Sequence, residues 1–199
     1  MPSSASQLSN EVVNRHYLGI LRREPSQTEL RLWVGAAGIQ RSKEALASTL
    51  IRQATEVRSI ARHYAGLMGR FPDGLDHLPT QEQEDGLTYW TNILRAFRAK
   101  HRGLSYREAL RYCIEDWFKA PEHLILFPSD LTAREFAERL CLQVTGSPLK
   151  TGDAWIPKLD EMERTAIAVE LAEGQAAKQY LNDGIDRRLL SAVDDAPGS

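Results

Sequence analysis

The side chains that could do chemistry are few, and they do not stand at the spacing of a reactive site. The five histidines are His16, His63, His77, His101 and His123. His16 and His63 each precede an aromatic residue in two similar segments, so we expect both to have a packing or capping role, because a metal site needs several converging donors. The sequence contains no Gly-x-Ser-x-Gly motif, phosphate-binding glycine loop or dinucleotide fingerprint. We therefore expect no catalytic residues.

Acidic side chains gather in one stretch and offer the hard oxygen donors that calcium prefers. They are Asp73, Asp76, Glu82, Glu84 and Asp85, within and beside residues 74–85. Their spacing does not fit the EF-hand loop. We expect a solvated loop here, with neither a bound metal nor a cofactor.

The two cysteines, Cys113 and Cys141, both fall within apolar helical patterns. Reduced cysteines buried as small hydrophobic side chains fit this setting. Neither a disulfide framework nor a zinc site is indicated, because no histidine stands at ligand spacing from either thiol.

Aromatic side chains beside carboxylates and amides would form a different kind of site, a shallow groove that binds sugars. The residues that we assign to such a binding site are Tyr89, Trp90, Tyr106, Trp117, Asp76, Glu84 and Asp85. Aromatic residues at helical spacing more often belong to the core. Both interpretations stay open on the sequence alone.

The overall charge argues against a general nucleic-acid-binding protein. Lys and Arg total 25 and Asp and Glu total 27, which gives a formal charge of −2, whereas phosphate binding is driven by clustered positive charge. One basic run extends from Arg95 through Arg98, Lys100 and His101 to Arg102. It is either a solvated helix end or a surface that docks onto an acidic partner.

The elements that must position these residues are predicted to be helices, in three diverged copies of one unit. The first copy has Tyr17, Pro25 and Trp33, the second has Tyr64, Pro72 and Trp90, and the third has Leu140, Pro148 and Trp155. In each copy we expect an aromatic or large apolar residue on a helix, a turn with proline, and a tryptophan packed between two helices.

Helix boundaries can be predicted within this unit. We expect helix ends at Arg22 and Gly69 and helix starts at Ser26, Ser42, Thr80 and Ser105. Glu29 and Gln83 stand three residues after Ser26 and Thr80, as capping-box partners do. Of the other two starts, only Ser105 has the full spacing, to Glu108.

These patterns predict an all-α protein: three diverged helical-hairpin repeat units packed into one domain, plus a C-terminal helix. The units span about residues 11–57, 58–125 and 130–173, and the last helix spans about 174–193. The second copy carries an insertion within residues 74–85, either a tolerated surface loop or part of a binding face. No segment is apolar enough to span a bilayer.

The quoted segments resemble a known family. Tyr17–Trp33, Tyr64–Trp90 and the run Ala120-Pro121-Glu122-His123 are similar to the unit of an uncharacterised helical repeat domain of bacterial secreted and surface proteins, including those with calcium-binding glycine-rich repeats. That domain is similar in turn to phycobilisome linker repeats. The resemblance covers about two thirds of the chain, and the third copy departs most. It implies a scaffolding or surface-associated role and transfers no catalytic residue, and the calcium-binding repeats are absent here.

The sequence thus favours a non-catalytic scaffold or adaptor protein of a multi-subunit or cell-surface assembly, such as a phage-like structure, whose partners are other protein subunits. The alternative is a module that binds carbohydrate, such as a surface polysaccharide. An enzyme would need a cleft with convergent titratable groups, which the sequence does not offer. Residues 1–7 lack the apolar core of a signal peptide. We therefore expect a cytoplasmic protein, or one secreted or particle-associated by another route.

Overall fold

The protein is all-helical wherever its structure is described, as the sequence predicts. The computed structural model describes residues 8–34, 42–80, 84–150, 152 and 155–194. Within these ranges there is no strand, and no helix combines the length and apolar character that a membrane crossing requires.

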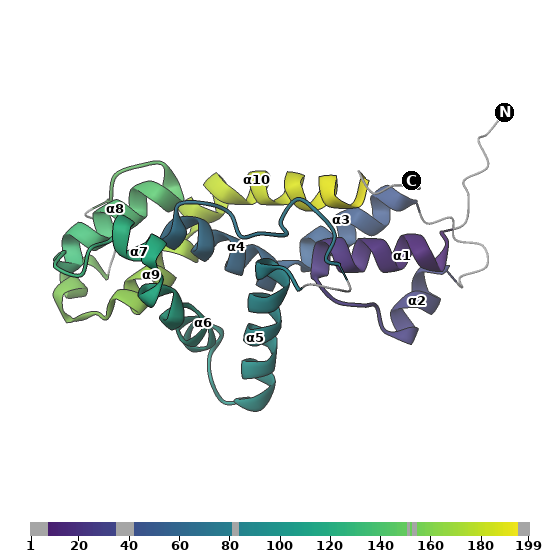
Figure 1. Ribbon diagram of the computed structural model, residues 1–199, viewed down its shortest axis with the longest axis horizontal. Helices are drawn as coiled ribbons and strands as arrows, with labels where there is room; N and C mark the ends of the chain where they lie inside the picture. Colours follow the sequence, from purple (N-terminus) through teal and green to yellow (C-terminus); the bar gives the residue numbers. More distant parts are fainter. Residues whose placement is uncertain (1–7, 35–41, 81–83, 151, 153–154, 195–199) are drawn as a thin grey trace.

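The helices follow one another along an elongated body (Figure 1). They are α1 (Asn10–His16), the π-helical η1 (Tyr17–Leu21), α2 (Gln27–Val34), α3 (Lys43–Gln53), α4 (Thr55–Met68), α5 (Gly86–Lys100), α6 (Tyr106–Glu115), the 3-10 helix η2 (Asp116–Lys119), α7 (Pro121–Leu126), α8 (Ala133–Thr145), the 3-10 helix η3 (Ile156–Glu161), α9 (Arg164–Ala172) and α10 (Gln175–Asp194). The C-terminal helix α10 packs on α8, α4 and η1 in turn, and so ties the two ends of the body together (Figure 1).

Most predicted helix starts are confirmed. Ser105 and Glu108 form a full capping box in front of α6, and Ser42 caps α3. The prediction at Thr80 is wrong, because α5 begins at Gly86 and its cap is Asp85, whose carboxylate accepts from the Thr88 N–H at 2.7 Å. The inserted residues separate Thr80 from the helix, and an aspartate directly before the first turn satisfies its free N–H groups.

The Ser26–Glu29 pair is also confirmed in front of α2. The Ser26 N–H donates to the Glu29 carboxylate at 2.8 Å, and the Glu29 N–H donates to the Ser26 hydroxyl at 3.3 Å. Gln83, the predicted partner of Thr80, lies outside the described residues.

Three helices end in the left-handed conformation at matching positions. Arg22 ends η1 with φ 56°, and Gly69 and Gly146 end α4 and α8 with φ 68° and 66°. These ends confirm the predictions at Arg22 and Gly69. Tyr17 and Tyr64 stand five residues before such a residue, and in α8 that position is Cys141, next to the predicted Leu140.

The three tryptophans of the predicted unit share their burial but not their neighbours. All three are half-buried against the core. The Trp33 indole N–H donates to the Tyr17 hydroxyl at 3.3 Å, Trp90 packs edge-on against Trp117, and Trp155 lines a surface pocket together with Cys141. Three equivalent hairpins therefore remain a prediction.

Two glycines allow close contacts between helices. A Cβ on Gly19 would lie 2.3 Å from Cγ1 of Val193, and a Cβ on Gly66 would lie 2.4 Å from Cγ1 of Val144. Because these glycines have no side chain, η1 packs directly against a valine of α10, and α4 packs directly against a valine of α8. The two cysteines are buried and free, as predicted, and burial raises the pKa of the Cys113 thiol to about 12.

Candidate functional site

A cluster of buried charged side chains lies where α4 meets α9 and α10. The Arg62 guanidinium, 2% exposed, donates to the Glu173 carboxylate at 2.6 Å, to the Ala172 carbonyl at 2.8 Å and to the Asn182 amide oxygen at 2.8 Å. The Ser59 hydroxyl donates to the same Glu173 oxygen. Glu173 also pairs with Lys178 of α10 at 3.5 Å, so the cluster ties three helices together through its ion pairs and hydrogen bonds.

The electrostatics of this cluster do not create a nucleophile. Burial by itself raises the pKa of Glu173, but the charge of Arg62 and the hydrogen bonds from Ser59 and Arg62 outweigh it, and the pKa is lowered. Burial lowers the pKa of His63 to about 4, so its ring is neutral at pH 7. The Ser59 hydroxyl donates to the Glu173 carboxylate and not to a histidine nitrogen. The lowered pKa of Glu173 makes this carboxylate a weak base for activating a serine.

The two histidines at equivalent sequence positions make the same local bond. His16 Nδ1 lies 2.8 Å from the Val12 carbonyl and His63 Nδ1 lies 2.8 Å from the Ser59 carbonyl, each four residues back along its helix. A carbonyl can only accept, so Nδ1 carries the proton and Nε2 is left as the acceptor. Across the described part of the chain, no group of three or more His, Cys, Asp or Glu side chains could hold a metal ion.

The three predicted acidic binding residues have different positions. Asp85 caps α5 and lies 3.5 Å from Arg22, which is a structural position. Glu84 is exposed and accepts a hydrogen bond from the Asn92 amide at 2.8 Å. Asp76 is also exposed, 3.3 Å from His77 Nδ1.

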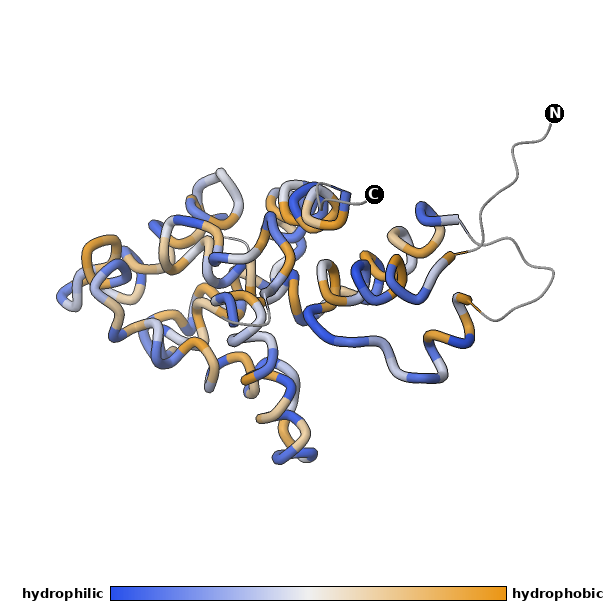
Figure 2. Tube along the Cα trace, turned by 45° about the vertical axis from the view of Figure 1, so that its right-hand side comes forward, coloured by the Kyte–Doolittle hydropathy of each residue, from blue (hydrophilic) through white to orange (hydrophobic). Residues whose placement is uncertain are grey.

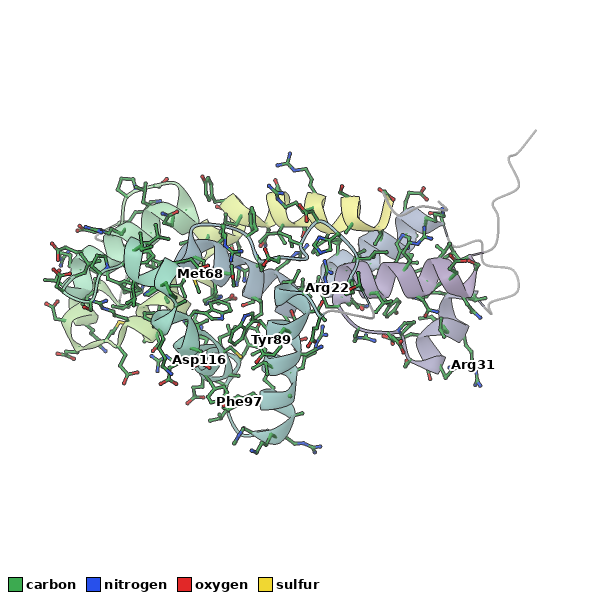
Figure 3. All side chains as sticks on the ribbon, in the orientation of Figure 1. Arg22, Arg31, Met68, Tyr89, Phe97 and Asp116 are labelled. Atoms are coloured by element: carbon green, nitrogen blue, oxygen red, sulfur yellow. The ribbon has the colours of Figure 1, made fainter. Side chains whose placement is uncertain are left out.

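Arg22 is a residue whose role the sequence reasoning missed. Its guanidinium donates to the His77 carbonyl at 3.0 Å and to the Gly74 carbonyl, and is fully enclosed (Figure 3). Burial lowers its pKa to about 10 although Asp85 opposes this, so it stays charged at pH 7. Arg22 thereby fastens the described part of the insertion to the end of η1. An arginine in place of the usual glycine at a helix end is the sequence signal for such a role.

Three of the four predicted aromatic residues come together, but as an edge-to-face stack. Trp90 lies between Tyr89 and Trp117, with ring centroids 5.1 and 5.2 Å away, and Trp117 continues to Tyr64 at 5.2 Å. Trp117 is only 2% exposed, whereas Tyr89 is 45% exposed and lies on the upper part of α5 (Figure 3). The fourth residue, Tyr106, is half-buried under the guanidinium of Arg98. The stack thus presents one open ring, that of Tyr89.

A hairpin formed by α5 and α6 projects from the body, and it is the most distinctive exposed feature (Figures 1 and 2). Phe97 holds its two helices together by stacking on Tyr112 with centroids 3.9 Å apart (Figure 3). Tyr112 and Leu104 are nevertheless 53% and 42% exposed. The α5–α6 hairpin therefore presents apolar side chains that the fold does not need to expose.

The same hairpin carries free positive charge. Arg95 and Arg98 both pair with Glu56, so these two cations of the basic run are engaged. Lys100, Arg102 and Arg111 are exposed and form no ion pair with any described residue. The end of the hairpin is therefore basic, with Leu104 and Tyr112 among the cations.

A separate hollow surrounds Trp155. It has a volume of about 480 Å³ and is lined by Trp155, Arg107, Lys150, Glu170, Gln175 and Gln179, among others. An aromatic ring, two amides and charged groups of both signs meet there, away from the aromatic residues that the sequence analysis selected.

Comparison with known proteins leaves the chain without an assigned family: no family model, no curated protein and no solved structure matches it. The resemblance to the helical repeat domain therefore remains a prediction.

Proposed function

We propose that the chain is a non-catalytic adaptor or scaffold protein that acts through contacts with other protein subunits. The observation that supports this most is the projecting α5–α6 hairpin, with exposed Leu104 and Tyr112 among unpaired cations. Aromatic residues and arginine are enriched in protein interfaces, where a few buried anchors supply most of the binding energy. The hairpin has this composition and protrudes far enough to meet a partner.

The charge of the hairpin favours an acidic protein surface as its partner. Lys100, Arg102 and Arg111 would meet carboxylates, and such charge complementarity raises association rates and selects partners. The chain as a whole has a charge of −2, which gives no long-range attraction to a polyanion such as nucleic acid. Three cations are also a small set for phosphate binding.

The buried polar groups are consistent with a role without catalysis. Ser59, His63 and Glu173 have the residue types of a hydrolytic site, but they lie in the core and are bonded to one another and to backbone. A reactive constellation needs a nucleophile bonded to its base beside a space for substrate. In this cluster the carboxylate beside Ser59 is a weak base because its pKa is lowered, and all three side chains are buried away from a substrate.

The test is the native mass of the protein purified from its source. We expect a complex of defined stoichiometry, weakened about tenfold by Tyr112→Ala, because losing one interface anchor costs roughly 1.4 kcal/mol. Tyr180→Ala is the matched control, since Tyr180 is equally exposed, at 56%, but lies on α10. A monomer at every concentration, or equal effects of the two substitutions, would contradict the proposal.

The hollow at Trp155 supports carbohydrate binding as a second candidate function. An aromatic face beside amides and charges is a setting in which a sugar ring can stack and its hydroxyls can hydrogen-bond. Titration with oligosaccharides that contain uronic acids, followed by tryptophan fluorescence, tests it. Saturable binding that Trp155→Ala removes and Tyr89→Ala leaves intact would favour this second candidate.

A further inference from the structure

An open groove lies between α3 and α10, beside α1. Its volume is about 540 Å³. Ala47, Ile51, Leu190 and Val193 supply apolar walls, His16 lies at its inner side and Lys43 at its edge. Such a groove between helices has the shape and chemistry that an apolar helix fills.

The helices around this groove match three helices in the second copy of the unit. His16 of α1 and His63 of α4 are both buried and make the same Nδ1 bond to the carbonyl four residues back. Gly19 then meets Val193 of α10, as Gly66 meets Val144 of α8. By these contacts, α10 packs on η1 in the same way that α8 packs on α4.

The third matching pair is α3 and α6. Both contain an Ala-Leu step, and the leucines, Leu46 and Leu110, are both 0% exposed. Aligning these leucines places Lys43 of α3 at the position of Arg107 of α6. Each cation therefore stands one turn before a buried leucine, although α3 packs directly on η1 and α1 whereas α6 packs on α5 and α9.

In the second copy, the space bounded by α4, α6 and α8 is occupied by α9, which contacts all three helices. Its buried side chains are small or medium apolar ones: Ala166, Ile167, Ala168, Val169, Leu171 and Ala172. Arg107 pairs with Glu170 of α9, and the Glu173 carboxylate that follows α9 lies 3.8 Å from His63 Nδ1. The second copy thus shows what kind of element covers this face.

We infer that the groove between α3 and α10 is the docking site for a short apolar helix of a partner protein, which takes the place that α9 takes in the second copy. The length fits, because a nine-residue helix such as α9 is roughly 14 Å long and α3 from Lys43 to Arg52 covers about the same distance. A carboxylate on the docked helix would face Lys43 as Glu170 faces Arg107. The inference rests on the proposed function in protein contacts and adds a second surface and the class of its partner.

The probe is a fluorescein-labelled peptide with the sequence of residues 163–174, acetylated and amidated, titrated with the full chain. We expect saturable binding that Ala47→Trp abolishes by filling the groove. Lys43→Glu should raise Kd about fivefold, the scale of one partly exposed ion pair, and a peptide with Glu170→Lys should restore binding to that variant. Lys158→Glu, an exposed lysine of η3, is the matched control and should change nothing.

Two results would overturn the inference. One is the absence of saturable binding, or binding that Ala47→Trp and Lys43→Glu leave unchanged. The other is binding that responds to Arg107→Glu instead of Lys43→Glu, since the peptide would then be replacing α9 in its own place. If Ala47→Trp loses the helical circular dichroism of the parent, the inference is tested by the charge exchange alone, in which Lys43→Glu weakens binding and a peptide with Glu170→Lys restores it.

Failure of the groove and failure of the proposed function give different results. If the complex from the source persists in the Ala47→Trp variant and the parent does not bind the peptide, the docking groove is contradicted and the adaptor function is not. If the protein from its source is always monomeric but binds the peptide at the groove, the adaptor function is contradicted and the docking groove is supported.

Discussion

The ion pair between Arg62 and Glu173 allows a stability prediction that can be worked out from its surroundings. Glu173→Gln keeps the shape of the side chain and one oxygen acceptor but removes the negative charge. Arg62 is 2% exposed, and its other donors reach only the neutral Ala172 carbonyl and the Asn182 amide. A guanidinium would therefore remain buried without a counter-ion.

The expected cost is about 3 kcal/mol in the free energy of unfolding. Breaking a buried pair by removing one partner costs roughly 3–5 kcal/mol, because the remaining charge is left without compensation. The lower end applies here, since the glutamine oxygen still accepts from Arg62. Removing both charges in Arg62→Met with Glu173→Leu should cost less than the sum of the two single changes by about 2 kcal/mol.

The assay is urea unfolding monitored by far-UV circular dichroism. The single variants Arg62→Met and Glu173→Leu and their double variant form a thermodynamic cycle. A loss below about 1 kcal/mol for Glu173→Gln would refute the reasoning, as would a double variant whose loss equals the sum. Arg58→Met is the comparison, because Arg58 pairs with Asp186 at 2.6 Å in a more exposed setting, with side chains 18% and 22% exposed. Its loss should be smaller than that of Arg62→Met.

Three further predictions concern the same core. Burial lowers the pKa of His63 to about 4, so between pH 6.5 and 4 the unfolded chain binds more protons than the folded one. About 3 kcal/mol of stability should therefore be lost as the pH falls through this window. The urea midpoint of His63→Asn should depend less on pH than that of the parent. Gly66→Ala should lower stability by about 1–2 kcal/mol, because its Cβ would lie 2.4 Å from Val144 Cγ1. Gly184→Ala is the control: a Cβ there meets nothing within 4 Å, so thermal unfolding should show a gain in stability of up to about 1 kcal/mol. Arg22→Lys should cost about 2 kcal/mol and speed hydrogen exchange at residues 74–77, because an ammonium cannot reproduce the forked contacts of the guanidinium.

Helix boundaries could be predicted from the sequence because they depend on a few neighbouring residues. The Ser105–Glu108 capping box and the left-handed end at Gly69 are both local arrangements, and both are present. The prediction at Thr80 failed because two caps were available, and the aspartate nearer the apolar run is the one used. Local rules rank such alternatives poorly when an insertion separates them.

The core contacts could not be predicted, because they join residues far apart in the chain. Arg62 and Glu173 are separated by 111 residues, and no local pattern connects them. Trp117, assigned to a binding groove, is buried between Tyr64 and Trp90. Its spacing from Cys113 and Ile114 on one helical face was the signal that favoured the core. Burial of an aromatic residue depends on which helix packs over it, which composition does not reveal.

Positions shared by the first two predicted copies differ in role from the surfaces that only one of them presents. The histidine bond to the preceding turn, the glycine–valine contact and the left-handed helix end occur in both of the first two copies, so these features serve the fold. The surroundings of these two predicted copies differ: the second includes the projecting α5–α6 hairpin, and the groove between α3 and α10 borders the first. Substitutions at the shared positions should therefore change the free energy of unfolding, whereas Lys43→Glu should change partner affinity at constant stability. A groove variant that lost stability without losing peptide affinity would show that this division between copies does not hold.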